Sequence, residues 1–316
     1  MESTRSEEFD VYAFAPLLNF HTDAPEIKLS DGCVIGPPTD AEVQICSKPA
    51  IGWYPEGWPS PSFVVRTQIQ KTVQTKVMLT DQPETYSYWP DDRSIGQVVD
   101  LRNAIRLFKH GAVGCGSTYM IRTETSKIAV ESAADRIFPC SQSNAYSISM
   151  AEVPLFSAFY DKCRSFDFKK HPEIQIAMLR FTFSYVFGWL YQPIDLMIGF
   201  EALYLGEEQE LSYKLAMRAS YLLGDTPHRR LHIYRVLRKA YSIRSKLVHG
   251  EEEPDEVEIE KGKYVPLGEF LSEVEDILRE SIKKFMELAT KYSHKQLLGT
   301  VLDDNVINGG SILSGT

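Results

Sequence analysis

The stretch that decides the fold of the C-terminal half is Thr226-Pro-His-Arg-Arg-Leu-His-Ile-Tyr-Arg-Val-Leu-Arg-Lys-Ala-Tyr-Ser-Ile-Arg-Ser-Lys-Leu-Val-His-Gly250. Thr226 is a good N-cap and Pro227 suits the first helical position, so a helix begins here, and Gly250 is a typical stop after it. At about 100° per residue the apolar side chains between these ends fall in one arc of roughly 140°. The sequence therefore predicts a helix with one buried face, made by Ile233, Tyr234, Leu237, Ala240, Tyr241, Leu247 and Val248.

Arg244 falls near the centre of this apolar arc. A buried charge costs several kcal/mol unless it is paired and hydrogen-bonded. We therefore expect Arg244 to meet a buried acid, a second subunit or an anionic ligand. The preceding apolar segment offers Asp195 and Glu201 as partners for a structural ion pair.

The same helix is strongly basic. It carries seven Lys and Arg residues and no acid between positions 228 and 246, in a chain whose formal net charge is −9. This contrast favours a local attraction to phosphate, although a run of charges can also be an ordinary solvated face. The candidate RNA-binding residues are Arg235, Arg238, Lys239 and Lys246. His249 stands at the end of the helix, either as a cap or as a catalytic group.

The chain changes character near residue 150. After it, apolar residues recur at helical spacing over 154–166, 172–191, 194–205, 211–223 and 267–288, which predicts a helix bundle. Before it, strands are expected at 26–29, 33–36, 63–73 and 119–122, with a helix over 95–108 that stops before Gly111. The expected class is α+β, with a strand-rich domain over 8–149, a helical bundle over 150–294 and a flexible tail over 295–316.

The bulk composition excludes several classes of protein. The acidic balance argues against a surface that binds nucleic acid everywhere. The five cysteines are widely spaced and odd in number, which favours reduced thiols over a disulfide framework or a zinc site. The N-terminus is polar and has no secretory signal, and the most apolar stretch, 181–205, is interrupted by Pro193, Asp195 and Glu201. We expect a cytoplasmic protein without a membrane span or a bound metal.

The segment Arg244-Ser-Lys-Leu-Val-His249 matches the R-x4–6-H motif of HEPN proteins. Together with residues 194–205, 215–223 and 240–250, it makes the chain resemble the ApeA-like HEPN family over about residues 150 to 290. The resemblance implies that the bundle is of the HEPN type.

Active HEPN proteins are endoribonucleases that need no metal or other cofactor and work as homodimers with one composite cleft. By this resemblance Arg244 would stabilise the scissile phosphate, and His249 would act as general base or acid. The products would be a 2′,3′-cyclic phosphate and a 5′-hydroxyl. A toxin or an antiphage defence protein, with a sensor or regulatory domain before the bundle, would fit this activity.

Ser245 departs from the family pattern, because active members often have Asn, Asp or His after the arginine. Serine can still form hydrogen bonds, so we keep it among the candidate catalytic residues. The alternative is a non-catalytic HEPN domain that serves for dimerisation or for binding nucleotide or RNA, in which Arg244 forms a structural ion pair.

Overall fold

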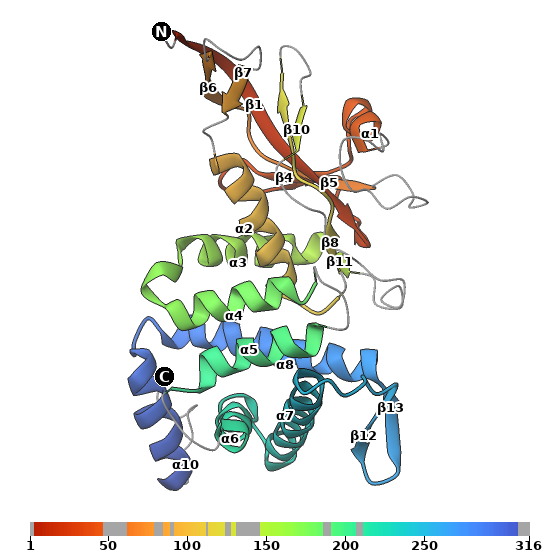
Figure 1. Ribbon diagram of the computed structural model, residues 1–316, viewed down its shortest axis with the longest axis vertical. Coiled ribbons are helices and arrows are strands. Elements are labelled where there is room, and N and C mark those ends of the chain that lie inside the picture. The colour runs from red at the N-terminus through yellow and green to blue at the C-terminus, as the bar shows by residue number, and fades with distance from the viewer. Residues whose placement is uncertain are drawn as a thin grey trace. The chain divides into compact units, whose positions relative to one another are not determined.

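The computed structural model describes residues 3–46, 62–78, 85–88, 92–111, 113–123, 128–130, 146–185, 191–206 and 211–308. The chain divides into two compact units, Met1–Ser165 and Phe166–Thr316, and each is described by itself. The first unit is rich in strands and the second is mostly helical (Figure 1), which confirms the α+β class expected from the sequence.

The sheet of the N-terminal unit is built around one long strand, β1 (Ser3–Leu18). The first part of β1 pairs with β6 (Gln70–Met78), which pairs in turn with β7 (Thr85–Tyr88). The second part lies between β5 (Phe63–Arg66) and β9 (Tyr119–Arg122), and its end also pairs with β8 (Gly114–Cys115). The sheet continues from β5 to β4 (Val34–Gly36) and β3 (Ile27–Lys28), and from β9 to β10 (Ile128–Val130). A separate parallel pair is formed by β2 (Phe20–Thr22) and β11 (Tyr146–Ile148).

The strands expected at 26–29, 33–36 and 119–122 are confirmed as β3, β4 and β9. The prediction of a single strand over 63–73 is wrong, because the structure has two strands in this region, β5 and β6. Three residues, 67–69, separate them where β1 has only Tyr12 and Ala13, so the pairing contains a bulge. Thr67 bridges the bulge, since its backbone N donates to the Ala13 carbonyl oxygen at 2.8 Å and its hydroxyl accepts from the Ala13 backbone N at 2.9 Å.

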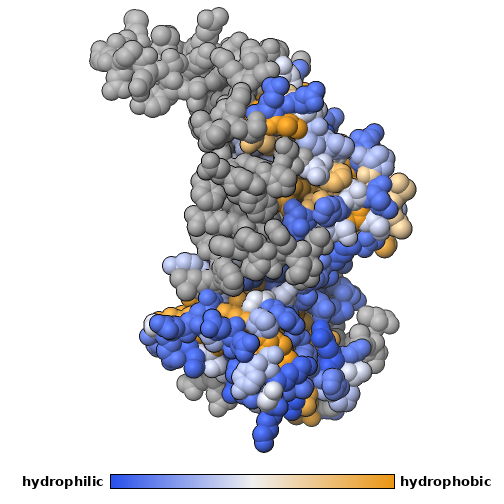
Figure 2. All heavy atoms as spheres, turned by 90° about the vertical axis from the view of Figure 1, so that its right-hand side faces the viewer, coloured by the Kyte–Doolittle hydropathy of each residue, from blue (hydrophilic) through white to orange (hydrophobic). Residues whose placement is uncertain are grey.

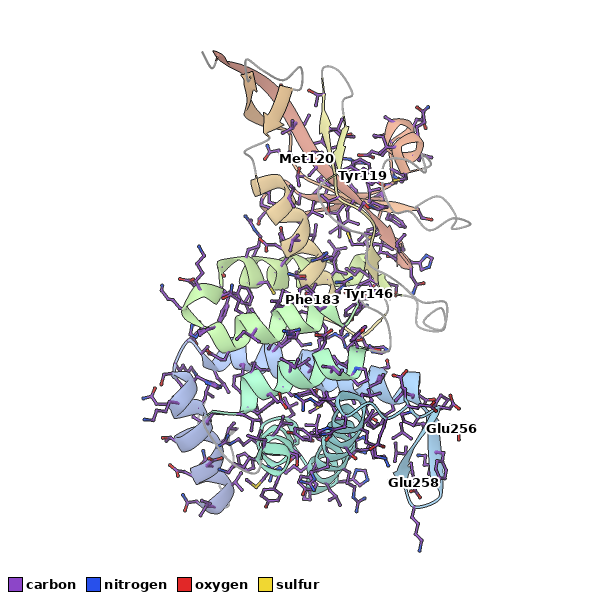
Figure 3. All side chains as sticks on the ribbon, in the orientation of Figure 1. Tyr119, Met120, Tyr146, Phe183, Glu256 and Glu258 are labelled. Carbon is purple, nitrogen blue, oxygen red and sulfur yellow. The ribbon has the colours of Figure 1, made fainter. Side chains whose placement is uncertain are left out.

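One face of this sheet is covered by helix α1 (Asp40–Cys46). Phe14, Val64 and Tyr119 of the sheet form a buried cluster with Ile45 and Cys46 of that helix. The rings of Phe14 and Tyr119 stack with centroids 5.0 Å apart, and Figure 3 labels Tyr119 among the crowded side chains of the unit. The expected helix over 95–108 is confirmed as α2 (Asp92–Phe108).

Helix α3 (Val153–Ser165) follows a short 3-10 turn at Met150–Glu152 and belongs to the N-terminal unit. The Asp31 carboxylate holds it there, because it accepts a hydrogen bond from the Tyr160 hydroxyl at 2.8 Å and lies 3.3 Å from an Arg164 nitrogen. Lys109 of the loop after α2 adds an ion pair with Glu152 at 2.6 Å. The unit therefore ends at Ser165, whereas the sequence had suggested an end at residue 149.

Five helices make up the body of the C-terminal unit. They are α4 (Pro172–Phe183), α5 (Gln192–Tyr204), α6 (Leu211–Leu223), α7 (Pro227–Val248) and α8 (Leu267–Leu288), preceded by a 3-10 turn at Phe168–Lys170. Their core is fully buried at Phe181, Phe200, Leu237 and Leu278. This confirms a helical C-terminal region.

The C-terminal segment is also helical in the described residues. It contains α9 (His294–Gln296), a π-helix at Leu297–Asp303 and α10 (Asp304–Asn308). Leu297, Leu298, Val301 and Leu302 are buried, and the π-helix packs against α6. The flexible tail expected from residue 295 therefore differs from the structure up to Asn308, because these apolar side chains complete the bundle.

A two-stranded hairpin that the sequence analysis did not expect separates α7 from α8. It consists of β12 (Glu256–Glu260) and β13 (Lys263–Pro266), with Gly262 in its turn at a φ of 77°. Val257 anchors it with 1% exposure, while Glu256 and Glu258, labelled in Figure 3, are exposed. The alternation of charged and apolar residues beside Lys261-Gly262 was the signal that could have revealed this hairpin.

No helix among the described residues is long and apolar enough to cross a membrane. Cys33, Cys46, Cys115 and Cys163 are buried and form no disulfide among the described residues, and Cys140 lies outside those residues. Burial raises the pKa of the Cys33 and Cys46 thiols to about 12, so both are poor nucleophiles.

Candidate functional site

Helix α7, which carries the motif, begins and ends where the sequence predicts. The Thr226 hydroxyl accepts a hydrogen bond from the Arg229 backbone N at 3.2 Å, and Pro227 occupies the first turn. His249 is the C-cap, and Gly250 follows with a φ of 83°, a conformation that glycine adopts without strain. The ends of this helix are therefore fixed by its own residues.

The buried face of α7 is rotated from the one that the sequence predicts. Buried residues are Ile233, Val236, Leu237, Ala240 and Ile243. Of the other predicted core residues, Tyr234, Tyr241 and Leu247 are only half-buried, and Val248 is 53% exposed. The reason is tertiary, because α5, α6 and α8 contact α7 and leave one apolar border of it uncovered. Arg244 consequently lies at the edge of the buried face instead of near its centre.

Arg244 has contacts that orient its side chain but do not occupy all the hydrogen-bond donors of its guanidinium group. Its Nη2 lies 3.7 Å from Glu201 Oε2 on α5, which is an ion pair but too long for a hydrogen bond. Its guanidinium carbon lies 5.8 Å from the ring centre of Tyr241, one turn earlier on the same helix. Among the described residues its Nε is buried without a hydrogen-bond partner, and the side chain is 25% exposed. Several guanidinium donors thus remain available to an anion.

Glu201, not Asp195, is the acid that meets Arg244. Asp195 accepts a hydrogen bond from Arg180 Nη1 at 3.0 Å, so its negative charge is used within α4 and α5. Burial raises the pKa of the Glu201 carboxyl, and the Arg244 charge opposes that rise. The expected structural partnership is therefore found for one of the two candidate acids.

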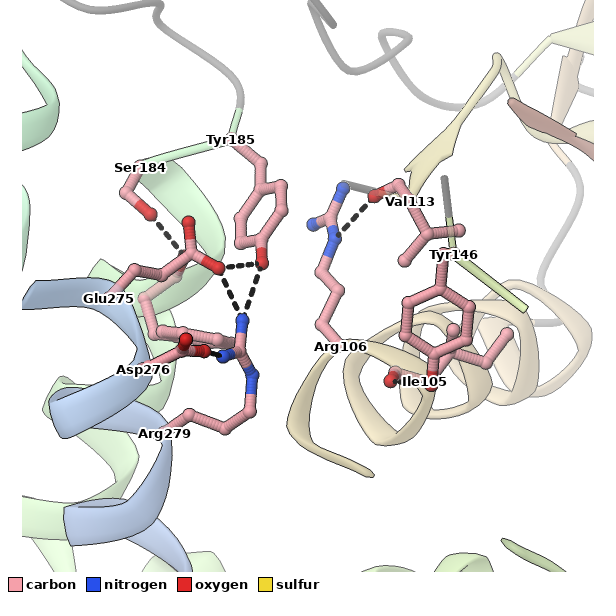
Figure 4. A network of polar contacts seen from close by, with 10 residues as sticks. Ile105, Arg106, Val113, Tyr146, Ser184, Tyr185, Glu275, Asp276 and Arg279 are labelled. Atoms are coloured by element: carbon pink, nitrogen blue, oxygen red, sulfur yellow. Dashed lines mark hydrogen bonds and ion pairs between the residues drawn. The ribbon is translucent and has the colours of Figure 1, made fainter. Parts of the chain in front are cut away.

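Two other arginines of the same bundle have guanidinium groups that are hydrogen-bonded to carboxylates. Arg218 is 1% exposed, and it donates to the two carboxylate oxygens of Asp303 at 2.8 and 2.6 Å and to the Tyr204 carbonyl oxygen at 2.7 Å. Arg279 is 2% exposed and binds Glu275, Asp276 and the Tyr185 hydroxyl, as Figure 4 shows. Arg244 differs from both because it is more exposed and, within the part of the chain that the structure describes, has no hydrogen-bonded carboxylate.

His249 and Ser245 complete the motif. His249 is exposed, and Ser245 is half-buried. His249 comes five positions after Arg244, which places the two side chains roughly 140° apart around an ideal helix axis. Among the described contacts, none joins the two side chains. One copy of α7 therefore presents the arginine and the histidine on different sides.

The predicted RNA-binding cations share one side of α7. Arg235, Arg238 and Lys246 are exposed and Lys239 is half-buried, and with His249 they fall in an arc of roughly 100°. Arg238 Nη1 donates to the Ser212 hydroxyl at 3.0 Å, and Lys246 forms an exposed ion pair with Glu251 at 3.4 Å. Exposed pairs of this kind are weak, so both side chains can still turn to phosphate.

Two features of α6, α7 and the segment that follows α7 were missed by the sequence analysis. One is Glu253, whose Oε1 is buried without a hydrogen-bond partner among the described residues, and whose pKa is raised by burial. The other is exposed apolar surface at Leu231 (47%), Tyr213 (45%) and Val248 (53%) on α6 and α7. Figure 2 shows apolar atoms in orange at the surface of the C-terminal unit, among hydrophilic atoms in blue. Neither feature has a sequence signal, because both depend on which neighbours cover a residue.

Comparison of the chain with protein-family models, with curated proteins and with solved structures gives no match. The likeness to HEPN proteins therefore rests on the motif residues and the helices around them. Within the described residues, no group of three or more His, Cys, Asp and Glu side chains could hold a metal ion.

Proposed function

We propose that the C-terminal unit is a HEPN-type endoribonuclease module that acts as a homodimer. The observation that carries this proposal is the incomplete pairing of Arg244: among the described residues its guanidinium has a buried Nε without a partner and one loose carboxylate contact. A purely structural arginine in this bundle is expected to resemble Arg218, which is hydrogen-bonded on both edges. Unused donors at a partly exposed arginine suit a phosphate group.

In the proposed reaction the 2′-oxygen of a ribose attacks the adjacent phosphorus, and the bond from phosphorus to the 5′-oxygen breaks. The attacking hydroxyl loses its proton to a base, and the leaving oxygen gains a proton from an acid. The His249 side chains of the two copies serve these two roles, one as base and one as acid, and Arg244 stabilises the negative charge that develops on the phosphate oxygens. The products are a 2′,3′-cyclic phosphate and a 5′-hydroxyl, so the atoms balance without a metal or another cofactor.

The placement of the two motif residues supports a homodimer in this proposal. Because Arg244 and His249 lie on different sides of one α7, a second copy can bring its arginine to the histidine of the first. Leu231, Tyr213 and Val248 supply exposed apolar surface for such a contact. The cations Arg235, Arg238, Lys239 and Lys246 then bind the RNA strand on both sides of the cleft. Ser245 lies beside Arg244 and is kept as a candidate catalytic residue that hydrogen-bonds the RNA.

For the whole chain we propose a conditional activity in a toxin or in antiphage defence, with the N-terminal unit as the sensor or regulator. A nuclease that acts on cytoplasmic RNA needs restraint, and the N-terminal unit offers a second compact fold that can supply it.

The test is RNA cleavage in the presence of EDTA by the full chain and by Arg244→Ala and His249→Ala. Two residues of the same helix serve as matched controls, because their partners lie on α8: Arg229→Ala loses an ion pair with Glu280, and His232→Ala loses one with Glu273. Cleavage that survives in the controls and disappears in the two motif variants supports the nuclease. Equal activity in all four variants contradicts it.

A second candidate function is a non-catalytic dimerisation or RNA-binding module. The ion pair between Arg244 and Glu201 favours it, because a cation with an internal partner has a structural role of its own. Ser245 at the position after the arginine points the same way. Binding of a labelled RNA without any cleavage by the wild-type chain would select this function.

A further inference from the structure

The contact between α5 and α7 gives Glu201 a place in the proposed site, although the sequence suggested it only as a structural partner. Glu201 stands in the last turn of α5, between the fully buried Phe200 and, two residues on, the fully buried Leu203. The backbone that carries its carboxylate is thus fixed by the core. Its side chain is 23% exposed, so water and ligands reach the carboxylate from one side.

The geometry orients Arg244 but does not use up its donors. At 3.7 Å the attraction between Glu201 Oε2 and Arg244 Nη2 is Coulombic, without a hydrogen bond. Such an attraction reduces the freedom of a long side chain, which otherwise loses rotamer entropy when it binds a phosphate. Asp195, by contrast, is hydrogen-bonded to Arg180 and contributes nothing to this arrangement.

The same carboxylate also lowers the positive charge that a phosphate meets at Arg244. Burial disfavours the charged form of Glu201, and the nearby charge of Arg244 favours it. At 3.7 Å the carboxylate offsets the positive charge of Arg244 only in part. A phosphate that approaches Arg244 therefore competes with Glu201. Glu201 thus has two effects on the site. By orienting Arg244 it favours turnover, and by offsetting the positive charge of Arg244 it weakens the binding of RNA.

We infer that Glu201 is a positioning residue for Arg244: it holds the guanidinium in the orientation that receives the scissile phosphate, and its charge keeps the affinity of the resting site for RNA low. This inference rests on the proposed function, since it assigns a role within the same site. It goes beyond a structural ion pair, because a structural pair changes stability alone.

Two substitutions separate orientation from charge. Glu201→Gln keeps an oxygen that can face Arg244 and removes the negative charge, so we expect RNA to bind about threefold more tightly with little change in turnover. Glu201→Ala removes both, so we expect turnover of bound RNA to fall about tenfold while binding is not weakened. Asp195→Asn, on the same helix, is the matched control and is expected to change neither.

The experiment measures single-turnover cleavage of a labelled RNA at saturating protein, and binding of the same sequence with 2′-O-methyl groups, which cannot be cleaved. Thermal unfolding of each variant checks that it is folded. Each Glu201 variant is also made together with Arg244→Ala, because a residue that acts through Arg244 has no effect once that side chain is gone. Equal turnover for the alanine and glutamine variants, or effects that persist without Arg244, overturn the inference.

The cleavage measurement and the binding measurement together distinguish a failure of this inference from a failure of the proposed function. If the wild-type chain cleaves no RNA, the nuclease proposal fails, while the binding arm still tests Glu201. Tighter binding by Glu201→Gln only when Arg244 is present then supports the role of Glu201 in phosphate binding. Unchanged binding in that case overturns it.

Discussion

A comparison of two ion pairs in the same bundle tests the central observation, that Arg244 is incompletely paired. The perturbations are Asp303→Ala, which removes the partner of Arg218, and Glu201→Ala, which removes the partner of Arg244. Arg218 is 1% exposed, and in Asp303→Ala the two donors that bind the Asp303 carboxylate, Nε and Nη2, lose those acceptors, while the bond to the Tyr204 carbonyl oxygen stays. Removing one partner of a buried pair costs about 3–5 kcal/mol.

Asp303 is 34% exposed, so water reaches one side of that pair, and we take the lower end, about 3 kcal/mol. The looser pair of Arg244 and Glu201, with both side chains about a quarter exposed, is worth about 0.5 kcal/mol. For a chain of 316 residues the corresponding falls in Tm are roughly 5 °C for Asp303→Ala and under roughly 1 °C for Glu201→Ala.

The assay is urea unfolding followed by far-ultraviolet circular dichroism, with thermal melting in parallel. Glu287→Ala is the control for an exposed pair, since Glu287 lies 3.1 Å from Lys284 at the surface of α8. A loss for Glu201→Ala as large as that for Asp303→Ala would refute the reasoning. Arg244 would then be a structural arginine, and the proposed function would lose the observation that carries it.

Three further predictions concern the surroundings of the motif. Burial raises the pKa of Glu253 above its ordinary value of 4.5, so the folded state holds this proton more tightly than the unfolded state, and stability falls as pH rises through that window. Glu253→Gln should therefore unfold at a higher temperature than the wild type at pH 7, and the difference should vanish below about pH 4.5; a constant difference contradicts this. Val248→Glu, at a site that is 53% exposed, should leave the fold intact and weaken the dimer in sedimentation equilibrium. A wild-type chain that stays monomeric contradicts the dimer itself. Arg235→Gln should reduce the slope of log affinity against log salt by about one without changing sequence preference; an unchanged slope removes Arg235 from the RNA surface.

The sequence came close to the site but could not complete it. Arg244 and His249 were identified because they stand out locally, one as a charge among apolar residues and the other beside a helix end. Glu201 and Asp195 were equivalent candidates, since both are acids in the same apolar segment. Only the rotation of α5 in the bundle decides between them, because it turns Glu201 toward α7 and leaves Asp195 to Arg180.

The sequence by itself determined the beginnings and ends of the helices around the motif and the division into a strand-rich and a helical part. It could do so because caps, turn glycines and apolar periodicity act over a few residues, as Thr226, Pro227 and Gly250 do for α7. The tertiary structure alone decided which arginines are saturated and which face of α7 is buried. Those features depend on partners far apart in the chain, such as Arg218 and Asp303, whose meeting is set by the packing of the whole bundle.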